Sequence, residues 1–185
     1  MRLSIDKTIN LGEVSLEVEI LEEASFGDVI NQIAIEAIDL IIQRTESGLD
    51  VRGNSFKNYS KEYVDSQNFE AFGKSSGDVN LVQEGNMINS IQVIEAYDNY
   101  FKIGYTDELN TLKAYNHNTG DTVPRREFFG LNKKEMNSIL EKYQYIINES
   151  LKSNFIKDSL LELFLGSKSP NKIIKSIVDA FSNDG

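Results

Sequence analysis

The chain has 185 residues, 40% of them hydrophobic, so its length and composition predict one main domain with a sizeable core. It contains no cysteine and one histidine, which excludes disulfides, thiolate metal sites and any centre that requires two histidines. A net charge of -10 argues against nucleic-acid recognition, because contacts with backbone phosphates dominate that affinity.

The charge is unevenly distributed along the chain. Residues 1–50 contain 11 acidic and 3 basic residues, whereas residues 124–185 contain 8 acidic and 10 basic residues. Two such ends can meet head to tail between subunits, but a solubilising acidic surface explains the same counts. No apolar run approaches the ~20 residues that span a bilayer, and the N-terminus alternates instead of resembling a signal peptide. We therefore expect a soluble, cytoplasmic protein that does not contact a membrane.

The N-terminal region predicts a β-hairpin. Glu13 to Leu21 alternate strictly between apolar and mostly acidic residues, which indicates a half-buried strand. Apolar residues within 3–9 indicate an earlier strand, and Asn10-Leu11-Gly12 suits the turn between the two. The acidic row on the second strand either discourages edge-to-edge pairing or faces a basic partner.

A long helix is expected next, capped by Ser25 and ended by Gly48. Its apolar stripe is broader than one buried face requires. The helix is therefore either the central core element or packed between the sheet and a neighbouring subunit. Residues 49–72 then read as a loop region rich in tyrosine and phenylalanine, and Gly73 to Asp78 as a flexible loop.

Short elements fill the middle of the chain. A short helix is expected at 86–89, and two alternating strands at 91–97 and 100–105 form a hairpin around Asp98-Asn99. Thr106 is the expected cap of another short helix, which carries His117. Gly85 and Ser90 are expected to shape the loop and short helix before this hairpin.

The segment from Val123 to Leu131 is expected to organise the rest. Pro124 favours an extended backbone, and Gly130 permits φ values that other residues avoid. A helix from 133 to about 150 follows, with Asn132 and Glu135 spaced as a capping box. Pro124, Phe128, Phe129 and Gly130 shape this turn, whereas Arg125 and Arg126 are expected to make charged contacts.

Beyond residue 150, apolar spacing predicts two more helices, broken at 166–170. We therefore divide the chain into a domain at 1–150 and a helical extension at 151–185, which either folds back or docks onto a partner. The predicted fold class is α+β, with both antiparallel hairpins packed on the long helix near the N-terminus and the helix after the Pro124–Gly130 turn.

Few residues suggest chemistry. His117 is the only candidate general base at neutral pH, and its neighbours Asn116 and Asn118 supply no nucleophile. Asp98 and Asp107 lie in turns without the spacing of a calcium loop. Arg125 and Arg126 can clamp a phosphate or a carboxylate, and we favour a carboxylate of the same or an adjacent subunit. We therefore predict no enzyme activity, no cofactor and no metal.

Five segments, taken in order, resemble a known family. Pro124 to Leu131 fits the pattern P-x-R-x-F-x-G-hydrophobic. The other four segments are Arg44 to Tyr63, Val79 to Ser90, Ile103 to Tyr105 and Ala114 to Gly120. Together they cover roughly residues 38–151 and resemble the phage virion morphogenesis, or tail-completion, family of tailed phages.

The resemblance implies a structural virion protein of a phage or prophage that completes the tail or joins tail to head at the neck. It implies a homo-oligomer, often a ring, with tail tube or terminator proteins and the head connector as partners. Such a protein would act in the host cytoplasm during assembly and remain in the virion.

Two alternatives remain open. One is a small acidic binding or inhibitor protein that mimics nucleic-acid charge, which requires a continuous exposed row of acidic residues. The other is an enzyme built on His117, which requires that residue in a cleft beside a serine or threonine nucleophile.

Overall fold

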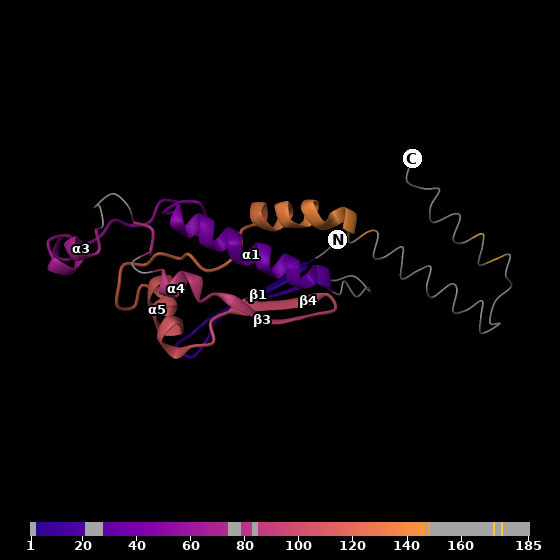
Figure 1. The fold of residues 1–185 in the computed structure, drawn as a ribbon, viewed down its shortest axis with the longest axis horizontal. Coiled ribbons are helices and arrows are strands. Elements are labelled where there is room, and N and C mark those ends of the chain that lie inside the picture. The colour runs from indigo at the N-terminus through magenta and orange to yellow at the C-terminus, as the bar shows by residue number, and fades with distance from the viewer. Residues whose placement is uncertain are drawn as a thin grey trace.

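The computed structural model describes residues 3–20, 28–73, 79–82 and 85–146, together with the single residues 148, 172 and 175. The fold is α+β, as predicted (Figure 1). The named elements are β1 (Leu3–Ile9), β2 (Val14–Ile20), α1 (Asp28–Glu46), α2 (Lys61–Val64), α3 (Gln67–Ala71), α4 (Asn86–Asn89), β3 (Gln92–Tyr97), β4 (Tyr100–Gly104) and α5 (Glu108–Thr119). A further helix spans residues 133–146.

The four strands form one antiparallel sheet in the order β1-β2-β4-β3. Both predicted hairpins are confirmed, and the N-terminal one pairs Ile5 with Val18. The central hairpin lies beside it because β4 pairs with β2, which brings Val18 opposite Phe101. The half-buried strand predicted from the alternation in β2 is confirmed, since its four apolar residues are fully buried on the core side.

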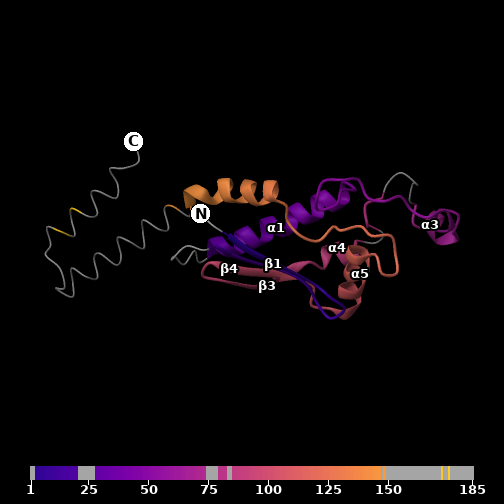
Figure 2. The same ribbon diagram turned by 180° about the vertical axis from the view of Figure 1, so that it is seen from behind.

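Helix α1 lies between two layers. One side of α1 packs on β3 and β4, and helix 133–146, drawn in orange, covers the other side (Figures 1 and 2). Lys142 of that helix forms an ion pair with Glu36 of α1. The broad apolar stripe of α1 is thus explained within one chain, because sheet and helix each bury part of it.

Several local predictions need correction or lie outside the described residues. The cap of α5 is Asp107, whose Oδ1 accepts the N–H of Asn110 at 2.8 Å, and not Thr106. Helix α5 is also longer than expected, with 12 residues. Within 49–72 the chain forms α2 and α3, which we did not predict, capped by Ser60 and Ser66. The expected cap at Ser25, the loop at 74–78 and the boundary at 150–151 lie outside the described residues.

The end of α1 is placed correctly by the sequence. Gly48 has a φ of +75°, and its N–H donates to the carbonyl of Thr45 in the last turn. A short bridge between Leu49 and Ser55 then closes the loop that follows. No helix in the described part of the chain is long and apolar enough to cross a bilayer.

Candidate functional site

The segment 123–131 runs as irregular backbone between α5 and helix 133–146 and is fixed by hydrogen bonds on both sides. The N–H of Arg126 donates to the carbonyl of His117 at 2.7 Å. The carbonyl of Glu127 accepts the N–H of Val51 at 2.8 Å. The segment therefore ties α5 to the loop after α1, although it belongs to neither a helix nor a strand.

Phe128 and Phe129 are completely buried, as their expected structural role requires. The Phe129 ring lies 5.9 Å from the ring of Tyr105, measured between centroids. The buried side chain of Asn118 holds the backbone here, because its Oδ1 accepts the N–H of Phe129 at 3.1 Å. Asn118 also donates to the carbonyl of Ala114, so one buried amide joins α5 to the segment.

Arg44 makes the strongest polar link to this segment. From the last turn of α1, its Nη1 donates to both carboxylate oxygens of Glu135 at 2.5 and 2.6 Å. Its Nη2 donates to the carbonyls of Phe128 and Gly130 at 2.5 and 2.8 Å. The side chains of Arg44 and Glu135 are only 7% and 13% exposed, so this ion pair is largely shielded from water.

No local pattern in the sequence indicates this role for Arg44. A basic residue in the last turn of a helix is common, because it interacts favourably with the helix dipole. Its Nε is buried and has no hydrogen-bond acceptor within the described residues. That unsatisfied donor indicates that the position of Arg44 is set by its Nη contacts.

Gly130 and the start of helix 133–146 behave as predicted. Gly130 has a φ of +130°, in the region that L residues with side chains rarely adopt. The capping box is reciprocal: Asn132 Oδ1 accepts the N–H of Glu135 at 3.0 Å, and Glu135 Oε2 accepts the N–H of Asn132 at 2.9 Å. Glu135 thus caps its own helix and pairs with Arg44.

Glu127 gathers three cations around one carboxylate. Lys7 lies 2.8 Å away, Arg125 2.9 Å and Arg52 3.4 Å, measured between side-chain nitrogen and carboxylate oxygen. Burial acts to raise the pKa of Glu127, but the hydrogen bond from Lys7 and the three positive charges together hold that pKa below its ordinary value. The predicted carboxylate partner of Arg125 is therefore in the same chain.

Arg126 differs from its neighbour and from the prediction. Its side chain is buried, and it donates to two backbone carbonyls, of Lys57 at 3.0 Å and Asn58 at 3.3 Å, instead of to a carboxylate. Its guanidinium carbon lies 5.2 Å from the centroid of the Tyr59 ring. Adjacent arginines thus point to different surroundings, because consecutive side chains of an extended segment face opposite sides.

Gly85 and Ser90 flank α4, as predicted. Gly85 precedes the helix with a φ of +78°, and a Cβ there would lie 2.8 Å from the side-chain Nδ2 of Asn89. The Ser90 hydroxyl donates to the carbonyl of Asn86 and accepts a hydrogen bond from Asn110 at 2.9 Å. These contacts connect α4 with the start of α5, so Gly85 and Ser90 have a local structural role.

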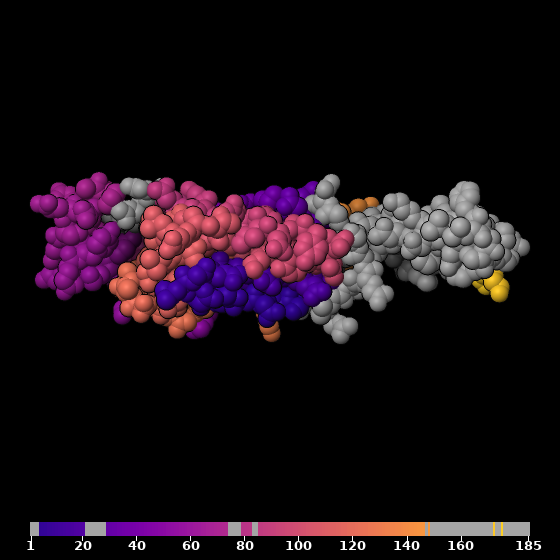
Figure 3. Space-filling model, turned by 90° about the horizontal axis from the view of Figure 1, so that it is seen from below, coloured from indigo at the N-terminus to yellow at the C-terminus, as the bar shows by residue number. Residues whose placement is uncertain are grey.

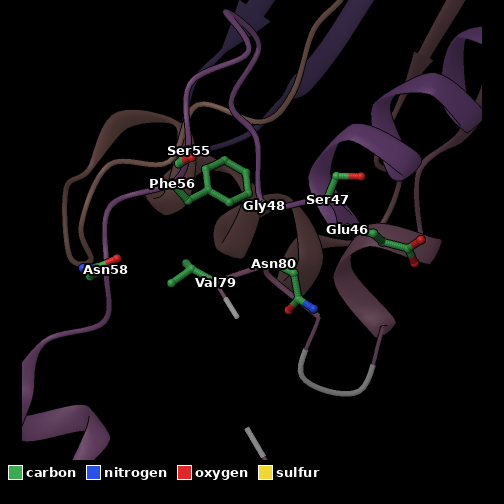
Figure 4. A pocket seen from close by; sticks show the side chains of 8 residues that line it. All are labelled: Glu46, Ser47, Gly48, Ser55, Phe56, Asn58, Val79 and Asn80. Atoms are coloured by element: carbon green, nitrogen blue, oxygen red, sulfur yellow. The ribbon is translucent and has the colours of Figure 1, made fainter. Parts of the chain in front are cut away.

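Several pockets lie near the segment, and one of them, of about 160 Å³, is lined by Arg125, Arg126 and Glu127, among others. Two others are larger. One, of about 240 Å³, is lined by the end of α1, the loop at 55–58 and residues 79–80 (Figure 4). The other, of about 390 Å³, is lined by Tyr59, Tyr63, His117, Pro124 and Arg126, among others. The second falls in the size range of ligand pockets and combines aromatic walls with a buried cation.

His117 shares the larger pocket with the hydroxyls of Ser60 and Thr122, which is the arrangement that an enzyme would need. The Ser60 hydroxyl, however, accepts the N–H of Tyr63 as a helix cap. Among the described residues, no hydrogen bond links His117 to either hydroxyl, and no group of three or more His, Cys, Asp or Glu side chains could hold a metal. The Ser60 hydroxyl is therefore engaged in capping α2.

The outer face of the sheet forms a second feature of the surface. No described element covers this face, on which β1 and β2 appear in indigo and β3 and β4 in pink (Figure 3). Four acidic residues from three strands point outward there. They are Asp6, Glu17, Glu19 and Glu95.

Lys102 is the basic residue in the middle of this face, and it is already paired with Glu13 and Glu17 at 2.8 and 3.0 Å. Those hydrogen bonds raise the pKa of Lys102 above its ordinary range, so it stays charged. Tyr97 and Tyr100 pack together at the hairpin end, with ring centroids 5.0 Å apart. The face therefore carries exposed acidic residues on both sides of the paired Lys102, with an aromatic pair at the hairpin end.

No family model, curated protein or solved structure matched this chain.

Proposed function

We propose that this chain is a structural assembly protein of a tailed phage or prophage, which completes the tail and joins it to the head. It acts as a homo-oligomer with tail tube or terminator proteins and the head connector as partners. The proposal begins from the resemblance of five ordered segments to the tail-completion family.

The observation that carries the proposal is that these five segments converge in space. Arg44 binds the carbonyls of Phe128 and Gly130, and the Tyr105 ring packs near Phe129. Helix α5 contacts the segment 123–131 through Asn118, whose side chain accepts the N–H of Phe129. The remaining segment, Val79 to Ser90, joins them where Val79 passes Gly48, so closely that a Cβ on Gly48 would lie 3.0 Å from the Val79 carbonyl oxygen.

The five segments therefore form one connected structural unit, as a family pattern that specifies one unit requires. The hydrogen bonds and the ring contact between these segments hold their backbone in one conformation, which keeps the surface that they form rigid. Rigid, preorganised surfaces favour assembly because less conformational entropy is lost on binding.

The experiment is a deletion of this gene in the phage or prophage that carries it. We expect filled heads and separate tails in electron micrographs, and few infectious particles. Plasmid-borne wild-type protein should restore infectivity, and so should the His117→Ala variant, since no chemistry is required. Unchanged infectivity after deletion would contradict the proposal. Failure of a folded His117→Ala protein to restore infectivity would favour an enzyme instead.

A second candidate function, a nucleic-acid mimic, is supported by the acidic residues Asp6, Glu17, Glu19 and Glu95 on the outer face of the sheet. Such a protein would inhibit a DNA-binding enzyme, because its carboxylates would occupy the phosphate sites. Inhibition assays with nucleases and polymerases test this. The triple variant Asp6→Asn, Glu19→Gln, Glu95→Gln should relieve any inhibition, and absence of inhibition by wild-type protein would remove this candidate.

A further inference from the structure

The larger pocket contains a buried cation without a counter-ion. Arg126 is 4% exposed, and it forms no ion pair with any carboxylate in the described part of the chain. The two backbone carbonyls satisfy N–H donors but carry no net charge. Arg44 and Arg125, in contrast, each have a glutamate partner in the same chain.

An uncompensated charge in a partly dry site attracts an anion. Burial lowers the pKa of Arg126, which is the expected response of a cation that loses hydration, yet a guanidinium remains protonated in proteins. Only two of its N–H groups donate to the carbonyls, so others remain for a ligand. A carboxylate fits the planar fork of the guanidinium, and the aromatic walls suit the aliphatic stem of a glutamate.

We propose that this pocket binds a carboxylate from a second copy of the chain, with Arg126 as the counter-ion. This inference rests on the self-assembly that the proposed function includes. The donor surface is the acidic outer face of the sheet, where Asp6, Glu19 and Glu95 form no ion pair among the described residues.

The two surfaces belong to different parts of the molecule. The chain around α3, next to the residues that supply Tyr59 and Tyr63, extends away from the sheet (Figure 1). A contact between the acidic face of one copy and the pocket of the next joins two different surfaces, so it can repeat head to tail as a heterologous contact. Repeated, such a contact closes into a ring or continues as a filament, which is the arrangement that a tail-completion protein needs.

The test uses Thr122, an exposed residue at the pocket, because replacing the buried Arg126 itself could unfold the loop it holds. Thr122→Glu supplies an internal carboxylate that competes with the partner's, and Thr122→Gln is the neutral control of equal length. Sedimentation velocity of the full chain over a concentration series measures self-association. We expect Thr122→Glu to weaken it by about tenfold or more and Thr122→Gln to leave it within about twofold.

The acidic triple variant at residues 6, 19 and 95 should weaken self-association similarly. Combined with Thr122→Glu it should cause little further loss, because both changes remove the same contact. Equal behaviour of the Glu and Gln variants, full additivity with the triple variant, or a strictly monomeric wild-type chain would overturn the inference. The gene-deletion experiment is independent of these results, so a failed pocket and a failed assembly role can be told apart.

Discussion

Replacing Arg44 with methionine should destabilise the fold more than removing any exposed ion pair. The change keeps the side-chain bulk but leaves the Glu135 carboxylate without its cation, in a site where both side chains are largely buried. It also removes the donors to the carbonyls of Phe128 and Gly130. Breaking a buried ion pair from one side typically costs about 3 to 5 kcal/mol, and we expect a loss of that size in the free energy of unfolding.

The assay is equilibrium unfolding in urea, followed by far-ultraviolet circular dichroism. Arg52→Met is the matched control, because it also removes an arginine from a glutamate but at 3.4 Å and with a side chain that is 70% exposed. That control should lose less than about 1 kcal/mol, as exposed pairs do. A loss below about 1 kcal/mol for Arg44→Met as well would refute our assignment of Arg44 as the main polar link.

A double-mutant cycle sharpens the test. Glu135→Gln alone removes the charge but keeps an amide oxygen that can accept the N–H of Asn132. In the Arg44→Met background, the same change should recover about 1 kcal/mol or more, because no unpaired carboxylate remains buried. Additive losses would mean that the two side chains act independently, in conflict with the two short hydrogen bonds that join them.

Four other substitutions test local features of the fold. The native pKa of Glu127 lies below its ordinary 4.5, so the ionised carboxylate stabilises the fold above that pH and the contribution is lost as pH falls. As the pH is lowered from about 5 to about 3, the free energy of unfolding should therefore fall less for Glu127→Gln than for the wild type. Parallel plots of unfolding free energy against pH for the two proteins would contradict this. Gly53→Ala, at a φ of +82° with open space around it, should cost about 1 to 2 kcal/mol through strain alone. Gly120→Ala, at a φ of +80°, places the added Cβ 2.8 Å from the Cβ of Arg125 and should cost at least about 1 kcal/mol more than Gly53→Ala. Equal losses for the two variants would show that Arg125 moves away without cost. Asn118→Ala should lower the free energy of unfolding by about 1 to 3 kcal/mol, because it removes the acceptor of the Phe129 N–H. Hydrogen exchange at the Phe129 amide should become faster, and an unchanged rate would argue against the hydrogen bond between Phe129 and Asn118.

The parts of the fold that could be predicted are those that local patterns specify. Alternation over Val14–Ile20 identifies a half-buried strand, and Asp98, with a φ of +48°, occupies the predicted turn between β3 and β4. The capping box at Asn132 was equally visible, because both partners lie within one helical turn. Each of these signals depends on residues a few positions apart.

What remained hidden depends on pairs that are distant in sequence. Arg44 and Glu135 are 91 positions apart, and nothing in either neighbourhood marks them as partners. Adjacent Arg125 and Arg126 read alike in sequence, yet one faces a carboxylate and the other two carbonyls. The choice of Asp107 over Thr106 as a helix cap shows the same limit on a smaller scale, since both residue types cap well and only the backbone geometry decides.

The Arg44–Glu135 contact also has a consequence for biosynthesis. Strands β1 and β2 and helix α1 leave the ribosome well before residues 133–146 do, and synthesis proceeds at about 5 to 20 residues per second. For several seconds the apolar side of α1 that helix 133–146 later covers is therefore exposed to solvent, unless a chaperone binds it. Nascent chains of this protein should therefore depend on holdase chaperones until the orange helix of Figure 1 has been translated.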